Sequence, residues 1–374
     1  MVALNFRILY ALLASLTLLH VVVARDLVTD LVRRGRPAMN AAIANSTTCT
    51  KEKLRIRREW GDISAREKRA YIAAVQCLIK RPSQLDPVQY PGAKSRFDDF
   101  IVIHMKYTLR IHGTGNFLSW HRYYTFAYET ALRTECGFNG TQPYWHWGRY
   151  ADSPETSPLF DGSDTSIGGQ GKFVPHNSST VRPAGRGGGC IDSGPFKGLM
   201  INLGPVGMID YPKPTNNSRA DGYGYNPRCV TRDISNYLTS RYTRTPQIAA
   251  LILNHTTIGD FQDTMQLRTG VHGAGHFTVS GDPGSDFYTS PGDVHFYFHH
   301  AMIDLVYSTW QSLDFPHRQQ VIAGGTRMFD DANNSTRQTL EDVVDLEVLN
   351  VDGKKYKIKE LVSTVRGPFC YLYQ

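Results

Sequence analysis

Apolar positions recur every three to four residues over several segments of the chain, and this spacing predicts amphipathic helices. Within residues 54–79, Trp60, Tyr71 and Leu78 follow the helical period, and Pro82 lies just beyond the segment. The same period predicts further helices over residues 97–109, 117–133, 234–254 and 296–313. The chain is therefore expected to be mainly α-helical.

Glycine marks the irregular part of the chain. Residues 161–230 hold 14 of the 33 glycines, and glycine disfavours helix interiors. We expect long surface loops there, with Cys190 and Cys229 as candidates to tie them together. Residues 346–358 alternate well enough to predict a short hairpin turning near Asp352-Gly353. Because no repeat of solenoid length is present, the prediction is one domain with a few short strands.

The N-terminus resembles a secretory signal. Arg7 lies in a short polar start, residues 8–23 are nearly all apolar, and Val22-Val23-Ala24 places small residues at a cleavage position. A membrane anchor is the alternative, because the apolar run is only slightly shorter than a span. We expect residues 1–24 to be a signal peptide, 25–36 a possible pro-segment and 37–374 a single domain. Arg33-Arg34 is either a processing site or a solvated basic pair.

Composition and charge narrow the class of protein. With 41% hydrophobic residues the chain is too apolar to be disordered. Its formal charge of +7 falls to +4 without the three net positive charges of residues 1–36, and no dense basic cluster is present, so a nucleic-acid partner is not expected. The six cysteines lack a CxxC pair and suit up to three disulfides in an oxidising compartment. Sequons begin at Asn45, Asn139, Asn177, Asn216, Asn254, Asn333 and Asn334. A secreted glycoprotein without stable membrane insertion is expected.

The candidate chemistry lies in two groups of histidines. His104, His112 and His121 fall within eighteen residues, and five more fall within residues 272–300. His272 and His276 are spaced i, i+4, which places both on one face of a helix. Imidazole is a common ligand of transition metals. Two similar helical elements that deliver histidines inward would form a four-helix-bundle core around two metal ions.

Other interpretations of these histidines are weaker. Burying the set without a metal would require hydrogen-bond partners for every ring nitrogen. Zinc hydrolases typically use HExxH, but residue 273 is Gly, and neither window has the carboxylates of a hard-cation site. The pattern therefore favours copper. Ordinary structural roles are expected for the remaining isolated histidines, His20, His176, His255 and His317.

Several motifs resemble the type-3 copper proteins, the family of tyrosinases, catechol oxidases and haemocyanins. They are His112-Gly followed by Asn116-Phe-Leu-Ser-Trp-His-Arg-Tyr-Tyr124, then Pro143-Tyr-Trp-His-Trp147, His299-His-Ala-Met-Ile-Asp304 and Tyr371-Leu-Tyr373. Arg57-Arg-Glu-Trp60 and Tyr71-Ile-Ala-Ala-Val-Gln-Cys77 look like the opening helix of the short secreted fungal members. The resemblance extends from about residue 54 to the C-terminus and is loose through the glycine-rich middle.

The resemblance implies a ligand set for two copper ions. The first copper, CuA, would take His104, His112 and His121, and the second, CuB, would take His272, His276 and His300. His299 would be a non-ligand neighbour, and His295 a structural residue. Asp304, four residues beyond the last ligand, would orient a ligand imidazole, although a helix-surface carboxylate is the alternative.

The resemblance also implies a reaction, the oxidation of small o-diphenols by O2 to o-quinones. Phe296 is the candidate platform for the substrate ring, with core packing as an equal alternative. Phe287 would narrow access to CuB. Many active monophenol hydroxylases have Asn directly after the first CuB histidine, but here this residue is Gly273, whose side chain can orient no water.

Two further departures from the family pattern are present. A cysteine that many relatives bond to the second CuA histidine is here Arg110, and the family's Trp-Asp-Trp is Trp145-His146-Trp147. We expect a secreted polyphenol oxidase with weak or absent monophenol hydroxylation. The alternatives are a tyrosinase with full monophenolase activity and a dioxygen-binding, haemocyanin-like protein. The sequence leaves the oligomeric state open.

Overall fold

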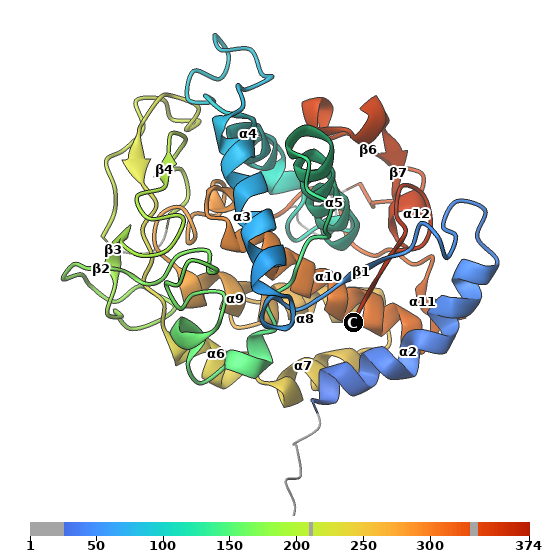
Figure 1. The fold of residues 1–374 in the computed structure, drawn as a ribbon. Helices are drawn as coiled ribbons and strands as arrows, with labels where there is room; N and C mark the ends of the chain where they lie inside the picture. Colours follow the sequence, from blue (N-terminus) through green and yellow to red (C-terminus); the bar gives the residue numbers. More distant parts are fainter. Residues whose placement is uncertain (1–25, 209–211, 330–335) are drawn as a thin grey trace, which may run out of the picture.

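Four buried helices form the core of the computed structural model, which describes residues 26–208, 212–329 and 336–374 (Figure 1). They are α4 (Arg96–Tyr107), α5 (Phe117–Cys136), α9 (Val271–Val279) and α10 (His295–Leu313). Their bounds confirm the expected helices over 97–109, 117–133 and 296–313 within a few residues, and α9 confirms that His272 and His276 share a helix. The mainly α fold with a helical core is therefore confirmed.

Local signals fix where these helices begin and end. Ser95 begins α4 as a capping box, because its side chain accepts from the Asp98 N–H while the Asp98 carboxylate accepts from the Ser95 N–H. Gly137, with φ of 67°, ends α5 in the left-handed conformation that glycine tolerates best. A second capping box, between Ser64 and Glu67, begins α3 (Ala65–Lys80).

The expected helix over residues 54–79 is wrong in its first half. Residues Arg55–Arg57 form strand β1, which pairs in parallel with β8 (Tyr371–Tyr373), and Trp60–Asp62 form a short 3-10 turn. The cause is the capping box at Ser64, which places the helix start later than the apolar spacing does. Likewise, the segment 234–254 forms two helices, α6 (Asn236–Tyr242) and α7 (Thr245–Asn254). The second of these has proline in its first turn.

An N-terminal helix was not expected. Helix α2 (Leu27–Ala44) lies across α10 and α7 (Figure 1) and buries Val28, Leu31 and Met39. A Cβ at Gly35 would lie 1.9 Å from the Ser312 Oγ of α10, so only glycine fits this contact. Most of the possible pro-segment 25–36 is thus part of a packed helix. The expected signal peptide, residues 1–24, lies outside the described residues.

The remaining elements are short. They are helices α8 (Ile258–Gln266), α11 (Phe315–Arg318) and α12 (Ile358–Leu361) and the 3-10 turns Thr108–Arg110, Trp147–Tyr150, Pro154–Thr156, Ser290–Gly292, Glu347–Leu349 and Val351–Gly353. Strand β2 (Gly171–Phe173) pairs with β3 (Gly188–Ile191), and β4 (Met200–Ile201) pairs with β5 (Arg228–Cys229), all antiparallel. Long loops connect them, which confirms the expectation for residues 161–230. The expected hairpin near Asp352-Gly353 is wrong in detail, because β6 (Val343–Val344) and β7 (Tyr356–Lys357) pair across two 3-10 turns.

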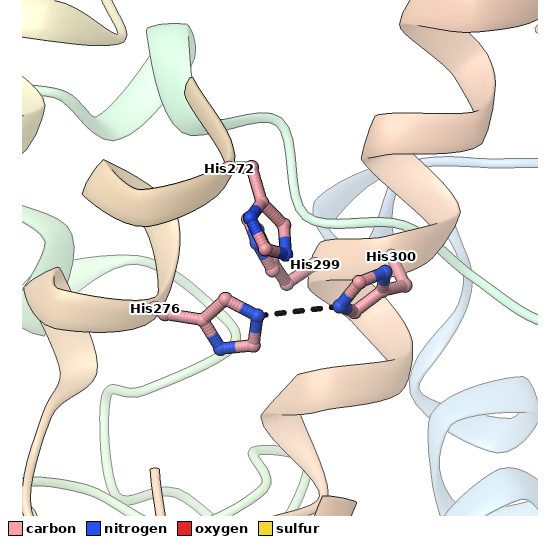
Figure 2. Close-up of side chains that lie close together, drawn as sticks. All are labelled: His272, His276, His299 and His300. Carbon is pink, nitrogen blue, oxygen red and sulfur yellow. Dashed lines mark hydrogen bonds between the residues drawn. The ribbon is translucent and has the colours of Figure 1, made fainter. Parts of the chain in front are cut away.

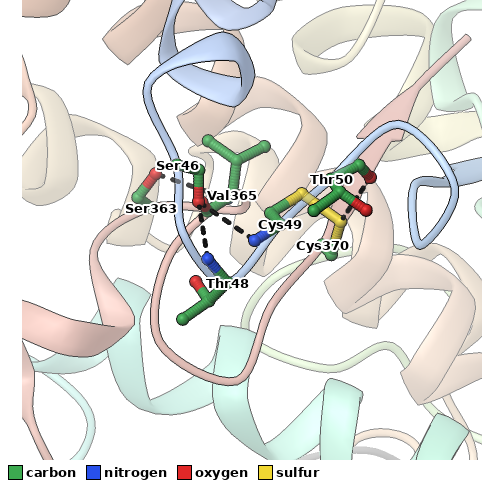
Figure 3. Close-up of a disulfide and its surroundings, with 7 residues drawn as sticks. All are labelled: Ser46, Thr48, Cys49, Thr50, Ser363, Val365 and Cys370. Atoms are coloured by element: carbon green, nitrogen blue, oxygen red, sulfur yellow. Dashed lines mark hydrogen bonds between the residues drawn. A yellow bond between two sulfur atoms is a disulfide. The ribbon is translucent and has the colours of Figure 1, made fainter.

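All six cysteines form disulfides, as expected. Cys190–Cys229 closes the glycine-rich region, and Cys77–Cys136 joins α3 to α5. Cys49–Cys370 joins the segment after α2 to the residue before β8 (Figure 3). In the described ranges, every helix is too short or too polar to cross a membrane.

Candidate metal centre

The first histidine group is held by three backbone carbonyl groups. His104 lies on α4, His121 on α5, and His112 in the segment between them. The Nδ1 atom of His104 lies 2.8 Å from the Tyr288 carbonyl oxygen. The Nδ1 atom of His112 lies 2.9 Å from the Thr108 carbonyl oxygen, and that of His121 lies 2.8 Å from the Phe117 carbonyl oxygen. A carbonyl oxygen only accepts, so each Nδ1 carries the proton and each Nε2 keeps its lone pair. The three imidazoles are thereby prepared as Nε2 ligands.

The second group comes from two helices. His272 and His276 project from α9, while His299 and His300 project from α10 (Figure 2). The Nε2 atoms of His276 and His300 lie 3.2 Å apart. Two imidazole nitrogens bound about 2.0 Å from one tetrahedral ion lie roughly 3.3 Å apart. These two rings therefore already have the separation of ligands to one ion.

The two groups adjoin each other. The His121 ring stacks on the His300 ring with 4.5 Å between centroids, and the His112 and His272 rings lie 6.0 Å apart. Within each group the candidate ligand atoms lie within 4.8 Å of one another. The arrangement is that of two metal positions side by side in the helical core.

Burial keeps these imidazoles neutral. All seven rings are buried, which lowers the pKa of each below the ordinary value, and neighbouring imidazoles lower the pKa of six of them further. The pKa of His112 falls to about 4, because burial outweighs its hydrogen bond to the Thr108 carbonyl group. Neutral imidazole is the form that binds a metal.

Unpartnered nitrogens indicate that a metal belongs here. The Nε2 atoms of His104, His121 and His272 are buried and form no hydrogen bond. Buried polar atoms are nearly always partnered, and orphans call for an explanation such as an ion. No carboxylate is in either metal-ligating group within the described ranges, so the donor set is all imidazole, which suits copper. The residues present therefore fit two copper ions.

A cleft of about 390 Å³ leads to the histidines. His112, His272 and His276 line it together with Gly273, Phe277 and Phe287. The Phe287 ring lies 4.5 Å from the His112 ring. Phe287 thus stands beside the histidines at the cleft wall.

Phe296 does not contact the cleft. Its side chain is fully buried, 4.1 Å from the His300 ring and 5.3 Å from the His104 ring between centroids. The platform role expected for Phe296 is therefore wrong, and the alternative of core packing holds. Phe296 lies one helical turn before His300 in α10, in contact with the His300 ring within the core.

Asp304 binds arginine and tyrosine rather than imidazole. Its carboxylate accepts from Arg122 Nε at 2.5 Å, from the Tyr371 and Tyr373 hydroxyl groups at 2.6 and 2.7 Å, and from Arg57 at 3.4 Å. The expectation that it orients a ligand imidazole is wrong. Instead Asp304 ties α10 to α5 and to the β1–β8 pair.

His299 is buried and is not among the residues that line the cleft. Its ring packs against Gly275 of α9, where a Cβ would lie 2.2 Å from a ring carbon, and lies 5.2 Å from the Trp147 ring. Of the isolated histidines, His176 binds Asp233, His255 binds Thr264 and the Leu251 carbonyl group, and His317 binds Asp314. His295 is buried with its Nδ1 3.4 Å from an Asp293 oxygen. Each of these four histidines thus has a polar neighbour outside the two groups, and a structural role stays a prediction; His20 lies outside the described residues.

His146 of Trp145-His146-Trp147 has a carboxylate neighbour from the N-terminal part of the chain. The His146 Nε2 lies 3.0 Å from an Asp26 oxygen at the start of α2. The His146 partnership holds the pKa of the Asp26 carboxyl low, although burial alone would raise it. Sequence reasoning missed this pair because 119 intervening residues separate its members and Asp26 fell in the possible pro-segment.

The helical core and the paired imidazole groups define a type-3 copper protein. The common central domain of tyrosinase matches residues 94–313. Tyrosinase P of Aspergillus terreus is 38% identical over 85% of this chain and 91% of its own length. The N-acetyl-6-hydroxytryptophan oxidase of Emericella nidulans is 35% identical over 90% of this chain and 97% of its own length. This chain belongs to the tyrosinase family.

A solved structure supports the same family assignment. A glycine-to-asparagine variant of the polyphenol oxidase from Thermothelomyces thermophila superposes with a TM-score of 0.86 and 36% identity, over 94% of this chain and 98% of that one. The family consists of dinuclear copper proteins, and these relatives are oxidases. The protein is therefore a copper oxidoreductase, and the family to which it belongs uses phenolic substrates and O2.

Proposed function

We propose that the protein is a secreted polyphenol oxidase that converts o-diphenols to o-quinones, with weak or absent hydroxylation of monophenols. The observation that carries this proposal is the cleft, which opens onto His112, His272 and His276 beside Gly273. When bound, the copper pair would supply the activation of dioxygen and the two-electron oxidation. The chain supplies the ligands, their orientation and the walls of the substrate site.

We assign His104, His112 and His121 to CuA and His272, His276 and His300 to CuB. The choice of His300 over His299 is supported by its ring contacts: His300 stacks on His121 of the other group, whereas His299 stacks on His272 of its own group and lies tilted against Trp147. Burial holds the imidazoles of both groups neutral, and the Nδ1 hydrogen bonds of the first group leave their Nε2 atoms as the ligand atoms. No side-chain nucleophile is needed.

Gly273 supports the limit on monophenol hydroxylation. A Cβ at this position would lie 2.5 Å from the Arg268 carbonyl oxygen and 2.9 Å from that of Leu267. Both are backbone atoms of the turn before α9, so they cannot yield as a flexible side chain would. Glycine is therefore required by packing here, and the site lacks the asparagine amide that orients a water in active hydroxylases.

Paired substrates test the proposal. Oxygen uptake by the copper-loaded protein is measured with 4-methylcatechol and with 4-methylphenol, which differ by one hydroxyl group. We expect rapid quinone formation from the catechol and a rate at least tenfold lower from the phenol. Comparable rates would establish full tyrosinase activity, and oxygen binding without quinone would establish a carrier. His276→Ala should abolish turnover, whereas His317→Ala, at an exposed histidine paired only with Asp314, should not.

Secretion is supported by three disulfides and by exposed glycan acceptors. Asn45, Asn139, Asn177, Asn216 and Asn254 are all exposed, whereas Asn333 and Asn334 lie outside the described residues. Because α2 is packed from Leu27 onward, we propose that the mature chain keeps this helix and that residues 26–374 form one domain. N-terminal sequencing of the secreted product tests this directly, and a first residue beyond Leu31 would contradict it.

A further inference from the structure

Among the residues that the structure describes, one charged side chain on the cleft wall, that of Arg268, has no ion-pair partner. Asp286 and Arg268 are its charged lining residues among those the structure describes, apart from the neutral imidazoles. The Asp286 carboxylate accepts from four backbone N–H groups, at 2.7 and 3.1 Å on one oxygen and at 2.8 and 3.2 Å on the other. Its hydrogen-bonding capacity is thus directed into the protein. Arg268 remains as the charge available to a ligand.

Arg268 is held in place but is exposed. It lies in the turn between α8 and α9, where the Gly270 N–H donates to the Leu267 carbonyl at 2.8 Å and the Ala274 N–H donates to the Gly270 carbonyl at 2.8 Å. Its own carbonyl packs against Gly273. The guanidinium group makes one weak contact, 3.4 Å from the Thr180 hydroxyl group, and no ion pair among the described residues.

The surroundings of Arg268 set the chemistry of its ligand. Phe277, Phe287, Leu109 and Met328 give the cleft an apolar wall suited to an aromatic ring. Arg268 lies in the turn before α9, four residues before His272, and lines the same cleft as His272 and Phe287. An arginine fork matches a carboxylate in both charge and geometry.

We propose that Arg268 recognises an anionic group on the side chain of the phenolic substrate, so that the preferred substrates are o-diphenols bearing a carboxylate. The inference rests on the proposed diphenol oxidation and deepens it by naming the substrate class. The contact lies away from the reacting hydroxyl groups and is the same before and during the reaction. Its loss should therefore raise KM and leave kcat nearly unchanged.

Three catechols of different charge test the proposal. They are 3,4-dihydroxyphenylacetate (anionic), 4-methylcatechol (neutral) and dopamine (cationic). In the copper-loaded wild type we expect kcat/KM to fall in that order. Arg268→Gln should lower kcat/KM for the anionic substrate about threefold to tenfold, as expected for one partly exposed charged contact. The same variant should leave 4-methylcatechol within about twofold, and Arg268→Lys should restore part of the preference.

The control separates a local contact from net charge. Arg66→Gln removes an equal charge from the exposed surface of α3, away from the cleft, and should change none of the three substrates. An unchanged substrate ranking in Arg268→Gln, or an equal effect of Arg66→Gln, would overturn the inference while leaving diphenol oxidation intact. Failure of the wild type to oxidise 4-methylcatechol would instead overturn the proposed function, and this inference with it.

Discussion

Replacing Asp304 with asparagine tests the ion network that braces the metal-bearing helices. The carboxylate lies on α10, four residues after His300, and receives two arginines and two tyrosine hydroxyl groups. Asparagine keeps the size of the side chain but removes the charge. One of its two oxygen positions also becomes an N–H2 group, which would face donors.

The structure gives the size of the effect. Arg57 keeps a second carboxylate partner in Glu129 at 2.9 Å, whereas Arg122 keeps the Gln311 side chain at 3.1 Å, a carbonyl oxygen at 3.5 Å and the face of the Tyr307 ring. Breaking a buried ion pair from one side costs about 3–5 kcal/mol. For 374 residues, an unfolding entropy of about 2.1 cal/mol/K per residue gives roughly 0.8 kcal/mol per degree, so the melting temperature should fall by about 4–6 °C.

The pH dependence follows from the direction of the shift. Burial alone would raise the pKa of Asp304, but Arg122 and Arg57 hold it below the ordinary value. A carboxylate with a lowered pKa stabilises the folded state above its unfolded pKa of about 3.9 and loses that contribution as pH falls through the folded pKa. The gap between wild type and Asp304→Asn should therefore be constant from pH 7 to 5 and narrow only below about pH 4.

Calorimetry and copper analysis of the same preparations complete the test. Tyr373→Phe is the matched control, because it removes one donor from the carboxylate and keeps the charge, at an expected cost of up to about 2–3 kcal/mol. Asp304→Asn should still bind two coppers per chain, because no imidazole contacts this carboxylate. Unchanged stability combined with the loss of one copper would refute the reasoning and restore a role for Asp304 in orienting a ligand.

Three further predictions follow from other parts of the molecule. Gly273→Asn should lower stability by about 1–3 kcal/mol through the clash with the Arg268 carbonyl and should not raise the rate with 4-methylphenol; oxygen uptake with a gain above tenfold would contradict this. Deleting residues 26–36 should lower the melting temperature by several degrees, because it uncovers α10 and removes the Asp26 partner of His146; an unchanged calorimetric transition would show that this half of α2 is dispensable. Copper-depleted protein should lose stability as pH falls from about 6.5 to 4. In this range the histidines bind protons in the unfolded chain, whereas His112 and its buried neighbours stay neutral in the folded protein because their pKa values are lowered. Chemical denaturation at several pH values should give a free energy of unfolding that is constant above pH 7 and falls below about pH 6.5. A maximum of this free energy below pH 5 would contradict the predicted direction.

Local patterns made the metal centre predictable. The histidines of both groups lie on the buried core helices or beside them, and i, i+4 spacing fixes the relative direction of His272 and His276 without any distant contact. The same holds for α4, α5 and α10, whose bounds follow the apolar period. The disulfide Cys190–Cys229, which closes the glycine-rich region, could also be predicted from the sequence.

Long-range contacts were not predictable in the same way. Strand β1 exists because it pairs with β8, more than 300 residues away, and no local signal in Arg55–Arg57 records that partner. The partners of Asp304 come from both ends of the chain, so its role depended on the tertiary fold. Helix α2 was missed for a different reason: its start adjoins an apolar leader and a dibasic pair, which together favoured a segment removed during processing.

The residues that line the cleft were the hardest feature to predict from the sequence. Phe287 and Phe296 are both aromatic and both close to the last ligand in sequence, yet one lines the cleft and the other is buried under His300. Which side of the histidines a ring occupies depends on how α10 packs. No local sequence pattern predicts a role for Arg268, because that role depends on its position at the cleft wall.

The most direct test of the two-copper site is an anomalous difference map recorded at the copper absorption edge from crystals of the copper-loaded protein. The assignment predicts two peaks of similar height, one bound by the Nε2 atoms of His104, His112 and His121 and the other by His272, His276 and His300. A single peak, no peak, or a second peak bound by His299 in place of His300 would contradict it.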